Sequence, residues 1–386
     1  MSVILLLGIV QALFFGVIVL TKKNKDQADY LLALLFLILA YEFFANLIFV
    51  TGYLTIFPHF FGTALPLVFL IGPLLFFYIK IHITESFYFK AKYLWHFLPY
   101  LVVNIIYLPF FMMSGREKVI EFQSLIDGRP SLLLSVILLL TSLSPLLYTI
   151  WSLNVIKKHR DQIPNLYSYT TEKMKLDWLW YLAWSMFFVS AVALILNSVI
   201  AIDDVVDWIQ LRLYILTISV VWVFSLGYYG IRRTPFFQDF PLVKEGESAG
   251  VIIEDLNRKK YEKTRVQEDA YEEYKKMLLD HMEEEKPYLN QKLTIAQVAQ
   301  QLDMPAYHLS QLLNEYLNQT FYEFINSYRI EEVKERYMDP ANRNLTLIGI
   351  ALESGFSSKS SFNRIFKQFT GKTPSEFIKS MEVLTV

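Results

Sequence analysis

Long apolar runs with few charges fill the first 230 positions of the chain. Seven runs are long enough to cross about 30 Å of hydrocarbon at about 1.5 Å per residue. They lie at about 2–20, 29–51, 63–81, 94–113, 131–154, 178–201 and 211–230. The first run has no Lys or Arg before it and no A-x-A pattern after it, so we expect an uncleaved span and not a signal peptide. The pattern predicts a polytopic transmembrane bundle of about seven helices over residues 1–230.

Basic residues gather in alternate loops, which predicts the orientation of the bundle. The loops after the first, third, fifth and seventh runs hold Lys22, Lys23, Lys25, Lys80, Lys90, Lys92, Lys157, Lys158, Arg160, Lys173, Lys175, Arg232 and Arg233. The opposite loops hold only Arg116, Lys118, Arg129 and Arg212. Because Lys and Arg in short loops stay on the cytoplasmic side, we expect the N-terminus outside and the C-terminal region in the cytoplasm. An odd number of spans requires the same arrangement.

After residue 230 the pattern changes to a charged one, with 21 Lys and Arg against 24 Asp and Glu. The stretch RRTPFFQDFPLVKEGESAG carries Pro and Gly and reads as a flexible exit from the membrane. An amphipathic helix follows within a linker at 231–286, with apolar or aromatic positions at Ala270, Tyr271, Tyr274, Met277, Leu278, His281 and Met282. We favour docking of this helix on the next domain. The alternative is a short coiled coil in a homodimer, but the repeat has fewer than three clean heptads.

Residues 287–386 contain an internal duplication. LTIAQVAQQLDM at 293–304 aligns with LTLIGIALESGF at 345–356, and LSQLLNEYLNQTFYEFINS at 309–327 aligns with FNRIFKQFTGKTPSEFIKS at 362–380. Each copy reads as helix, turn, helix, so one supersecondary unit is used twice. The units span about 293–318 and 345–371. The predicted fold class is therefore all-α, a transmembrane bundle followed by a cytoplasmic double helix-turn-helix domain.

The second helix of each unit has an apolar and a polar face. The expected inward residues are Leu309, Leu312, Leu313 and Tyr316 in the first unit, and Phe362, Ile365, Phe366 and Phe369 in the second. The expected outward residues are Tyr307, Ser310, Gln311 and Asn314, and Lys359, Ser360, Asn363, Arg364 and Lys367. Amide, hydroxyl and basic side chains of this kind suit the base edges and phosphates of a major groove, so double-stranded DNA is the predicted partner.

Local signals place the ends of the remaining helices. Gly371 fits a left-handed helix stop, and TPSE fits a new start with Thr373 as N-cap and Glu376 in a capping box. A helix of 19 residues between Thr320 and Pro340 would join the two units over about 28 Å. That length is close to the roughly 34 Å between successive major-groove faces, so one chain can reach two of them.

With these residues in view, the chain resembles the AraC family of transcription regulators over about residues 287–382. The run IALESGFSSKSSFNRIFKQFTGKTPSEF carries most of the resemblance, and the layout is similar to that of membrane-bound AraC-type regulators of bacteria. The resemblance implies base reading by Tyr307, His308, Ser310, Gln311, Lys359, Ser360, Asn363 and Arg364, with Lys367 on phosphate. It also implies a multi-pass protein of the bacterial inner (cytoplasmic) membrane, in contact with membrane lipids.

The first unit departs from the family pattern. DMP stands where a turn glycine is usual, so we expect a turn reshaped around Asp303. The helix at 306–317 has no Lys or Arg, and residues 290–386 hold ten basic and ten acidic residues. We therefore expect the second unit to supply most of the electrostatic attraction to DNA.

Polar residues inside the predicted spans are costly and suggest function. Glu42 lies near the middle of the second run, and Asn46, Asn104 and Asn197 join it as possible sensing residues, with Gln11 nearby in the first run. The competing interpretation is a protonated or hydrogen-bonded carboxyl that fixes helix packing.

Composition excludes several kinds of chemistry. The chain has no cysteine, and its six histidines are scattered, so we expect no metal, no cofactor and no enzyme activity. The leading hypothesis is a one-component regulator that binds DNA under control of an unknown signal ligand at the membrane. The alternatives are a transporter or receptor whose C-terminal module contacts proteins, and spans that serve only as an anchor. No inverted repeat supports transport.

Overall fold

The computed structural model describes residues 2–23, 25–84, 87–127, 130–169, 176–202, 207–231 and 268–382. The predicted exit segment at 232–250 and the basic residues Arg129, Lys173, Lys175, Arg232 and Arg233 lie outside these ranges. The chain forms two compact units. Unit 1 comprises Met1–Lys158 and Leu176–Phe236, and unit 2 comprises His159–Lys175 and Phe237–Val386.

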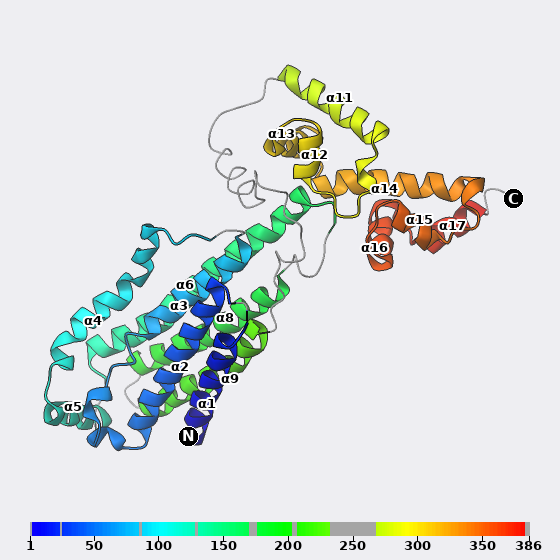
Figure 1. The fold of residues 1–386 in the computed structure, drawn as a ribbon. Helices are drawn as coiled ribbons and strands as arrows, with labels where there is room; N and C mark the ends of the chain where they lie inside the picture. Colours follow the sequence, from blue (N-terminus) through cyan, green and yellow to red (C-terminus); the bar gives the residue numbers. More distant parts are fainter. Residues whose placement is uncertain are drawn as a thin grey trace. The chain divides into compact units, whose positions relative to one another are not determined.

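Unit 1 is a bundle of helices (Figure 1), most of them apolar in sequence. Its helices are α1 Ser2–Leu20, α2 Gln27–Val50, α3 Val68–Ile83, α4 Leu98–Phe111, α5 Gly115–Asp127, the first part of α6 Leu132–Leu166, α8 Asp177–Ile202 and α9 Trp208–Ile231. In the bundle α1 packs on α2 and α9, α2 on α3, and α8 on α9. Large apolar side chains such as Val3, Phe14 and Phe188 stand 60% or more exposed on its surface. A face of that kind suits lipid better than water.

Among the residues that the structure describes, six helices are long and apolar enough to cross a membrane, counting Ala91–Phe111 as one and including α6, which continues beyond unit 1. The region expected to cross at 63–81 contains the shorter helix Val68–Ile83, because tight turns occupy the residues before it. The loop expected at 114–130 contains the amphipathic helix α5. The run that was expected to end near 154 continues as helix to Leu166.

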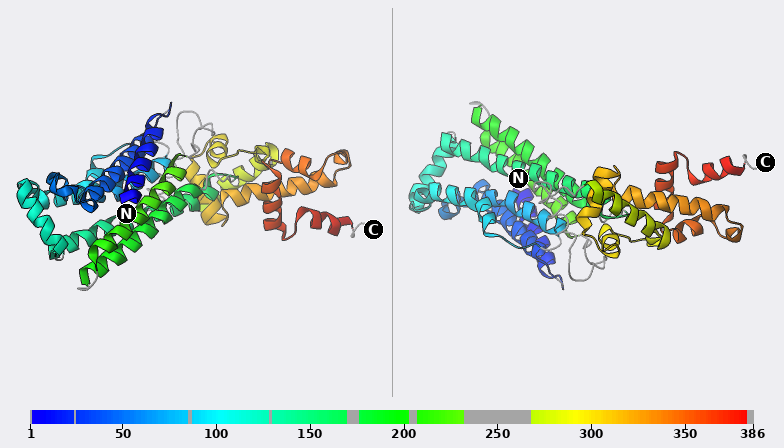
Figure 2. Two further views of the ribbon diagram at one scale, coloured as in Figure 1. Left: turned by 90° about the horizontal axis from the view of Figure 1, so that it is seen from below. Right: turned by 90° about the horizontal axis from the view of Figure 1, so that it is seen from above.

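Unit 2 is built around one long helix. Its helices are α11 Glu268–Glu284, α12 Ile295–Gln301, α13 Ala306–Gln311, α14 Phe321–Met338, α15 Leu347–Glu353, α16 Lys359–Thr370 and α17 Pro374–Glu382. Two hydrophobic clusters share α14: Phe321 and Ile325 belong to the cluster with α12 and α13, and Ile330 and Val333 to the cluster with α15 and α16. Both views of Figure 2 show α14 running from the first group of short helices to the second. The helix expected between Thr320 and Pro340 is confirmed as α14, and Thr320 and Glu323 form its capping box.

Helix α11 packs on the first helix-turn-helix unit. Leu278 and Met282 are almost fully buried in the same cluster as α12 and α13. Tyr271 stacks on Tyr316 with the two ring planes 14° apart. Within unit 2, α11 therefore docks on the neighbouring helix-turn-helix unit, as we favoured over a coiled coil.

Candidate nucleic-acid interface and sensing residues

Helix α16 is placed by clear local signals. The Ser358 hydroxyl accepts a hydrogen bond from the Ser361 N–H at the start, and Gly371 ends the helix with φ +73°. Phe362, Ile365 and Phe366 are buried beneath it. The prediction that Phe369 also points inward is wrong, since this side chain is 36% exposed in the last turn, beyond the buried cluster.

The opposite face of α16 matches the prediction. Lys359, Ser360, Asn363, Arg364 and Lys367 are all exposed. Arg364 is held at the edge of this face, because its Nη2 donates to the Tyr322 hydroxyl on α14 at 2.9 Å. Asn363 lies between two lysines one turn away on either side. The face therefore offers an amide for a base edge and two cations for phosphates.

The reading face predicted for α13 is only partly outward. Tyr307, His308 and Gln311 are half-buried. The prediction that Ser310 points out is wrong: it is 5% exposed, and its hydroxyl accepts from Nδ2 of Asn314 at 3.2 Å. Tyr316, expected inside, is 37% exposed. Leu312–Tyr316 form a π-helical turn, whose extra residue rotates the faces away from the regular 3.6-residue pattern.

Neighbouring side chains occupy the α13 face. The His308 ring stacks near Tyr274 of α11 with centroids 5.7 Å apart, and Gln311 donates to Glu315 at 2.8 Å. No Lys or Arg lies on this helix. Polar contacts to DNA from α13 would require these side chains to leave their present partners. On α16, the contacts that would change are those of Arg364 with Tyr322 and of Ser360 with the Ser358 hydroxyl, whereas both lysines are exposed.

The two turns share one geometry, which corrects the expectation that the first is reshaped. Met304 N–H donates to Ala299 O at 2.9 Å, and Phe356 N–H donates to Ala351 O at 3.1 Å, at equivalent positions. Asp303 takes φ +51° where Gly355 takes φ +94°. Aspartate tolerates the left-handed region better than most residues, so it replaces glycine there without changing the turn.

A buried arginine ties the domain together. Arg329 on α14 is 1% exposed and donates to the carbonyls of Tyr288 and Asn290, both at 2.7 Å. It also donates to Ser168, at 3.1 Å to the carbonyl and 3.0 Å to the hydroxyl. Burial lowers the pKa of Arg329 to about 10, so it stays charged at neutral pH.

Ser168 belongs to a short segment that directly follows α6. Its hydroxyl donates to Leu293 O at 2.8 Å, and Tyr167 forms a β-bridge with Thr294 at the start of α12. Leu166 is 4% exposed within the cluster of α12 and α13. The segment 166–169 therefore completes the core of the helix-turn-helix domain. Periodicity does not reveal this segment, because it consists of the last residue of α6 and the irregular residues that directly follow it.

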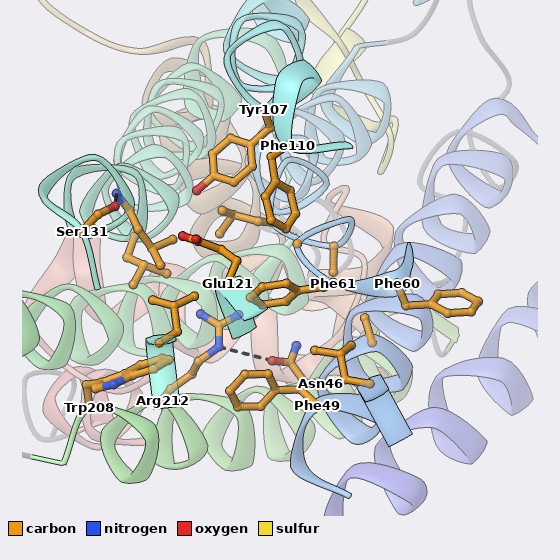
Figure 3. A pocket seen from close by; sticks show the side chains of 18 residues that line it. Asn46, Phe49, Phe60, Phe61, Tyr107, Phe110, Glu121, Ser131, Trp208 and Arg212 are labelled. Carbon is orange, nitrogen blue, oxygen red and sulfur yellow. Dashed lines mark hydrogen bonds between the residues drawn. The ribbon is translucent and has the colours of Figure 1, made fainter. Parts of the chain in front are cut away.

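The predicted sensing residues fall into two groups. Glu42, Asn46 and Asn197 line cavities within unit 1, whereas Asn104 bonds back to Tyr100 O on its own helix and lines neither of these cavities. Figure 3 shows the larger cavity, with Arg212 and Trp208 of α9 beside Asn46. Loop-charge counting places Arg212 only among the loop residues, although it stands inside α9. Its place one turn inside an apolar run was the signal that could have identified it.

The described part of the chain contains no cluster of His, Asp and Glu suited to a metal ion. Comparison with known proteins then bears on the C-terminal unit. Residues 298–380 match the family described as a helix-turn-helix domain. This range covers both turns, α14 and α16.

Curated relatives match about a quarter of the chain. An uncharacterized HTH-type transcriptional regulator of Staphylococcus aureus (strain COL) is 34% identical over 90 residues, which are 23% of this chain and 12% of that protein. The probable transcription factor PqrA of Proteus vulgaris is 27% identical over 88 residues, which are 23% of this chain and 70% of that protein. This chain thus spans about an eighth of the first relative's length. No solved structure gives a significant match.

The helix-turn-helix match and the regulator relatives support DNA binding and transcription regulation by the C-terminal region.

Proposed function

We propose that this protein is a membrane-embedded one-component transcription regulator of the bacterial inner membrane. Its cytoplasmic helix-turn-helix pair binds double-stranded DNA in a sequence-specific way, under control of a signal at the membrane domain. The observation that carries the proposal is the exposed face of α16, in a chain whose described residues include six helices long and apolar enough to span a membrane. The N-terminus lies outside and the helix-turn-helix pair lies in the cytoplasm, as the loop charges predict; this arrangement requires the shorter apolar helix Val68–Ile83 to serve as a seventh span.

Within this proposal the two helix-turn-helix copies contribute differently to DNA binding. Lys359 and Lys367 bind phosphates, Asn363 reads a base edge, and Arg364 exchanges its bond with Tyr322 for DNA. The α13 face contributes Tyr307, His308 and Gln311 once their side chains reorient. Ser310 supports the helix from inside.

The signal has a covalent path in this proposal. Helix α6 begins with residues that line the larger cavity of unit 1, among them Leu134 and Leu138. It ends at Leu166, within the core of the DNA-binding domain. A shift between two states of the membrane domain changes DNA affinity only if the signal binds those states differently. We place that shift on α6 and the segment 166–169.

DNA binding is tested with the full-length chain in lipid nanodiscs, because a fragment that begins after the membrane domain lacks residues 166–169. Genomic DNA fragments, including the protein's own upstream region, are selected over a salt series. We expect sequence-selective binding that weakens with salt. The double variant Lys359→Ala, Lys367→Ala removes two phosphate contacts, so its salt slope falls by about 2 and its affinity at least ten-fold.

The matched control is Lys276→Ala, Lys292→Ala, which removes two exposed lysines from other elements. It should bind DNA like the unchanged protein. Asn363→Ala should keep the salt slope and relax preference at one base position, by about 1–3 kcal/mol. Equal weakening by both lysine pairs, or no selective binding at low salt by folded protein, argues for a module that contacts proteins instead.

A further inference from the structure

The larger cavity of unit 1 has a volume of about 150 Å³. It lies where the ends of α2, α4 and α9 meet α5 and the start of α6, at the end of the bundle that the loop charges place outside. Aromatic side chains form most of its wall, among them Phe61, Phe110 and Trp208. A cavity of about this size in a protein core holds a benzene ring. Its shape and lining therefore suit a small molecule with an apolar body.

One cation stands in this apolar wall. The Nε of Arg212 donates to Oδ1 of Asn46 at 3.3 Å, and this is the guanidinium's one hydrogen bond to the described residues. A guanidinium has five N–H donors. Figure 3 shows its nitrogens turned toward the space that the Tyr107 hydroxyl also faces. The donors that remain are available to a ligand.

The charges around Arg212 are separated from it. Glu42 acts on it electrostatically, yet the two form no ion pair in the described structure. Glu42 instead lines a second cavity of about 80 Å³, which shares Arg212, Leu65 and Leu138 with the first. Glu121 lines the larger cavity but is exposed. Arg212 is half-buried in the cavity wall, and none of the described carboxylates is within ion-pair distance of it. A partly desolvated cation is stabilised by a close negative partner.

The second cavity contains a further buried polar group that lacks a hydrogen-bond partner in the described part of the chain. Ser190 lines it, is 2% exposed, and has a buried hydroxyl with no hydrogen-bond partner among the described residues. A buried polar group without a hydrogen bond costs about 1–3 kcal/mol of stability. Ser190 and Arg212 line this same cavity, and both have polar groups that a polar ligand or its water can satisfy.

We propose that the larger cavity binds a small apolar monocarboxylate. The carboxylate accepts two hydrogen bonds from Arg212, a pairing whose geometry guanidinium groups favour, and the apolar body packs among Phe61, Phe110 and Trp208. The exposed carboxylate of Glu121 lines the same cavity, so a second carboxylate on the ligand is disfavoured. As the identity of the signal, this inference rests on the proposed regulator; as a binding site, it stands alone.

The test uses the full-length chain in nanodiscs at neutral pH, with benzoate and hexanoate as probes. Binding is measured by isothermal titration, and benzamide and hexanamide serve as neutral probes of matched shape. We expect saturable binding of the carboxylates at least ten-fold tighter than of the amides, and weaker binding of the dianion phthalate than of benzoate. Amides that bind as tightly as acids, or no binding of any probe, overturn the proposal.

Variants separate the site from general stability. Arg212→Gln should weaken benzoate binding at least ten-fold, whereas Arg116→Gln, an exposed arginine on α5 that does not line the cavity, should leave it unchanged. Ala45→Phe fills the cavity from its buried wall and keeps the arginine, so it should also abolish binding. Equal binding by Arg212→Gln and unchanged protein contradicts the site.

DNA binding by the same preparations reports folding and keeps the two proposals distinct. Carboxylate binding without selective DNA binding counts against the regulator alone. Selective DNA binding without carboxylate binding counts against this site alone.

Discussion

At the scale of single residues, Gly355 and Asp303 occupy equivalent positions in the two turns, both with positive φ, but only Gly355 has no room for a side chain. A Cβ at Gly355 would lie 2.3 Å from Tyr288 O and 2.8 Å from Nε of Arg329. Gly355→Ala therefore adds both left-handed strain and a clash with backbone, and we expect it to lower the unfolding free energy of the domain by about 3 kcal/mol. Asp303→Gly relieves the non-glycine conformation and should be neutral or stabilise by about 1 kcal/mol.

Hydrogen exchange of the α14 amides in the full-length chain measures both variants, because this helix joins the two clusters. Ser357→Ala, an exposed turn residue, is the control. A Gly355→Ala protein with unchanged protection shows that the backbone at Tyr288 yields, and that the close approach is not required.

Glu332 on α14 gives the domain a pH dependence. It is 5% exposed and accepts hydrogen bonds from Arg336 at 2.6 Å and from Lys286 and Tyr288, both at 3.0 Å. Burial raises its pKa, but these three bonds outweigh burial and the net pKa is lowered below 4.5. A carboxyl with a lowered folded-state pKa stabilises above the unfolded-state pKa and loses that contribution as pH falls through the folded value.

Glu332→Gln should therefore lower the opening free energy measured by hydrogen exchange of the α14 amides by about 2 kcal/mol at pH 7. The difference from the unchanged protein should shrink as pH falls below about 4.5. Glu331→Gln removes a carboxylate whose side chain is 63% exposed and should show neither effect. A Glu332→Gln deficit that is constant between pH 7 and pH 3 means that packing, and not the charge, is what the glutamate supplies.

At the scale of elements, sequence patterns predicted what repetition and capping encode. The duplicated units, α14 between Thr320 and Pro340, and the caps of α16 and α17 all follow from residues near each element in the chain. The π turn that follows α13 is not predictable from the pattern, because its sequence differs little from that of a regular helix. Tyr316 is exposed at its end, whereas Ser310 is buried in the regular helix before it. Helix α5 was missed because it is short and polar on one side.

The candidate sites show the same division. The exposed face of α16 was predictable from periodicity alone. The cavity around Arg212 was not, because its walls come from segments between Ala45 and Arg212 that only tertiary packing brings together. Periodicity identifies a buried face but not the partner that covers it. Asn104 and Asn46 therefore look alike in the sequence, but in the structure only Asn46 contacts Arg212, whereas Asn104 donates to Tyr100 O on its own helix.

At the scale of the whole molecule, residues 166–169 make the DNA-binding domain depend on the helix that precedes them. Leu166→Ala empties part of a buried cluster, which costs about 2–4 kcal/mol in cores, and Ser168→Ala removes an acceptor of Arg329 and the donor to Leu293. We expect both to reduce exchange protection of α12 and α14. Leu147→Ala, a substitution at a side chain of α6 that is 56% exposed, should change neither.

Transmission gives these variants a second readout. If α6 carries the signal, Leu166→Ala at a temperature where the domain is folded should keep benzoate binding and DNA binding, while the change in DNA affinity caused by benzoate is lost. Leu147→Ala should retain that change, because its side chain is exposed. A Leu166→Ala protein in which benzoate still shifts DNA affinity fully would place transmission elsewhere, with α11 as the next element to test, since it too packs on the core of α12 and α13.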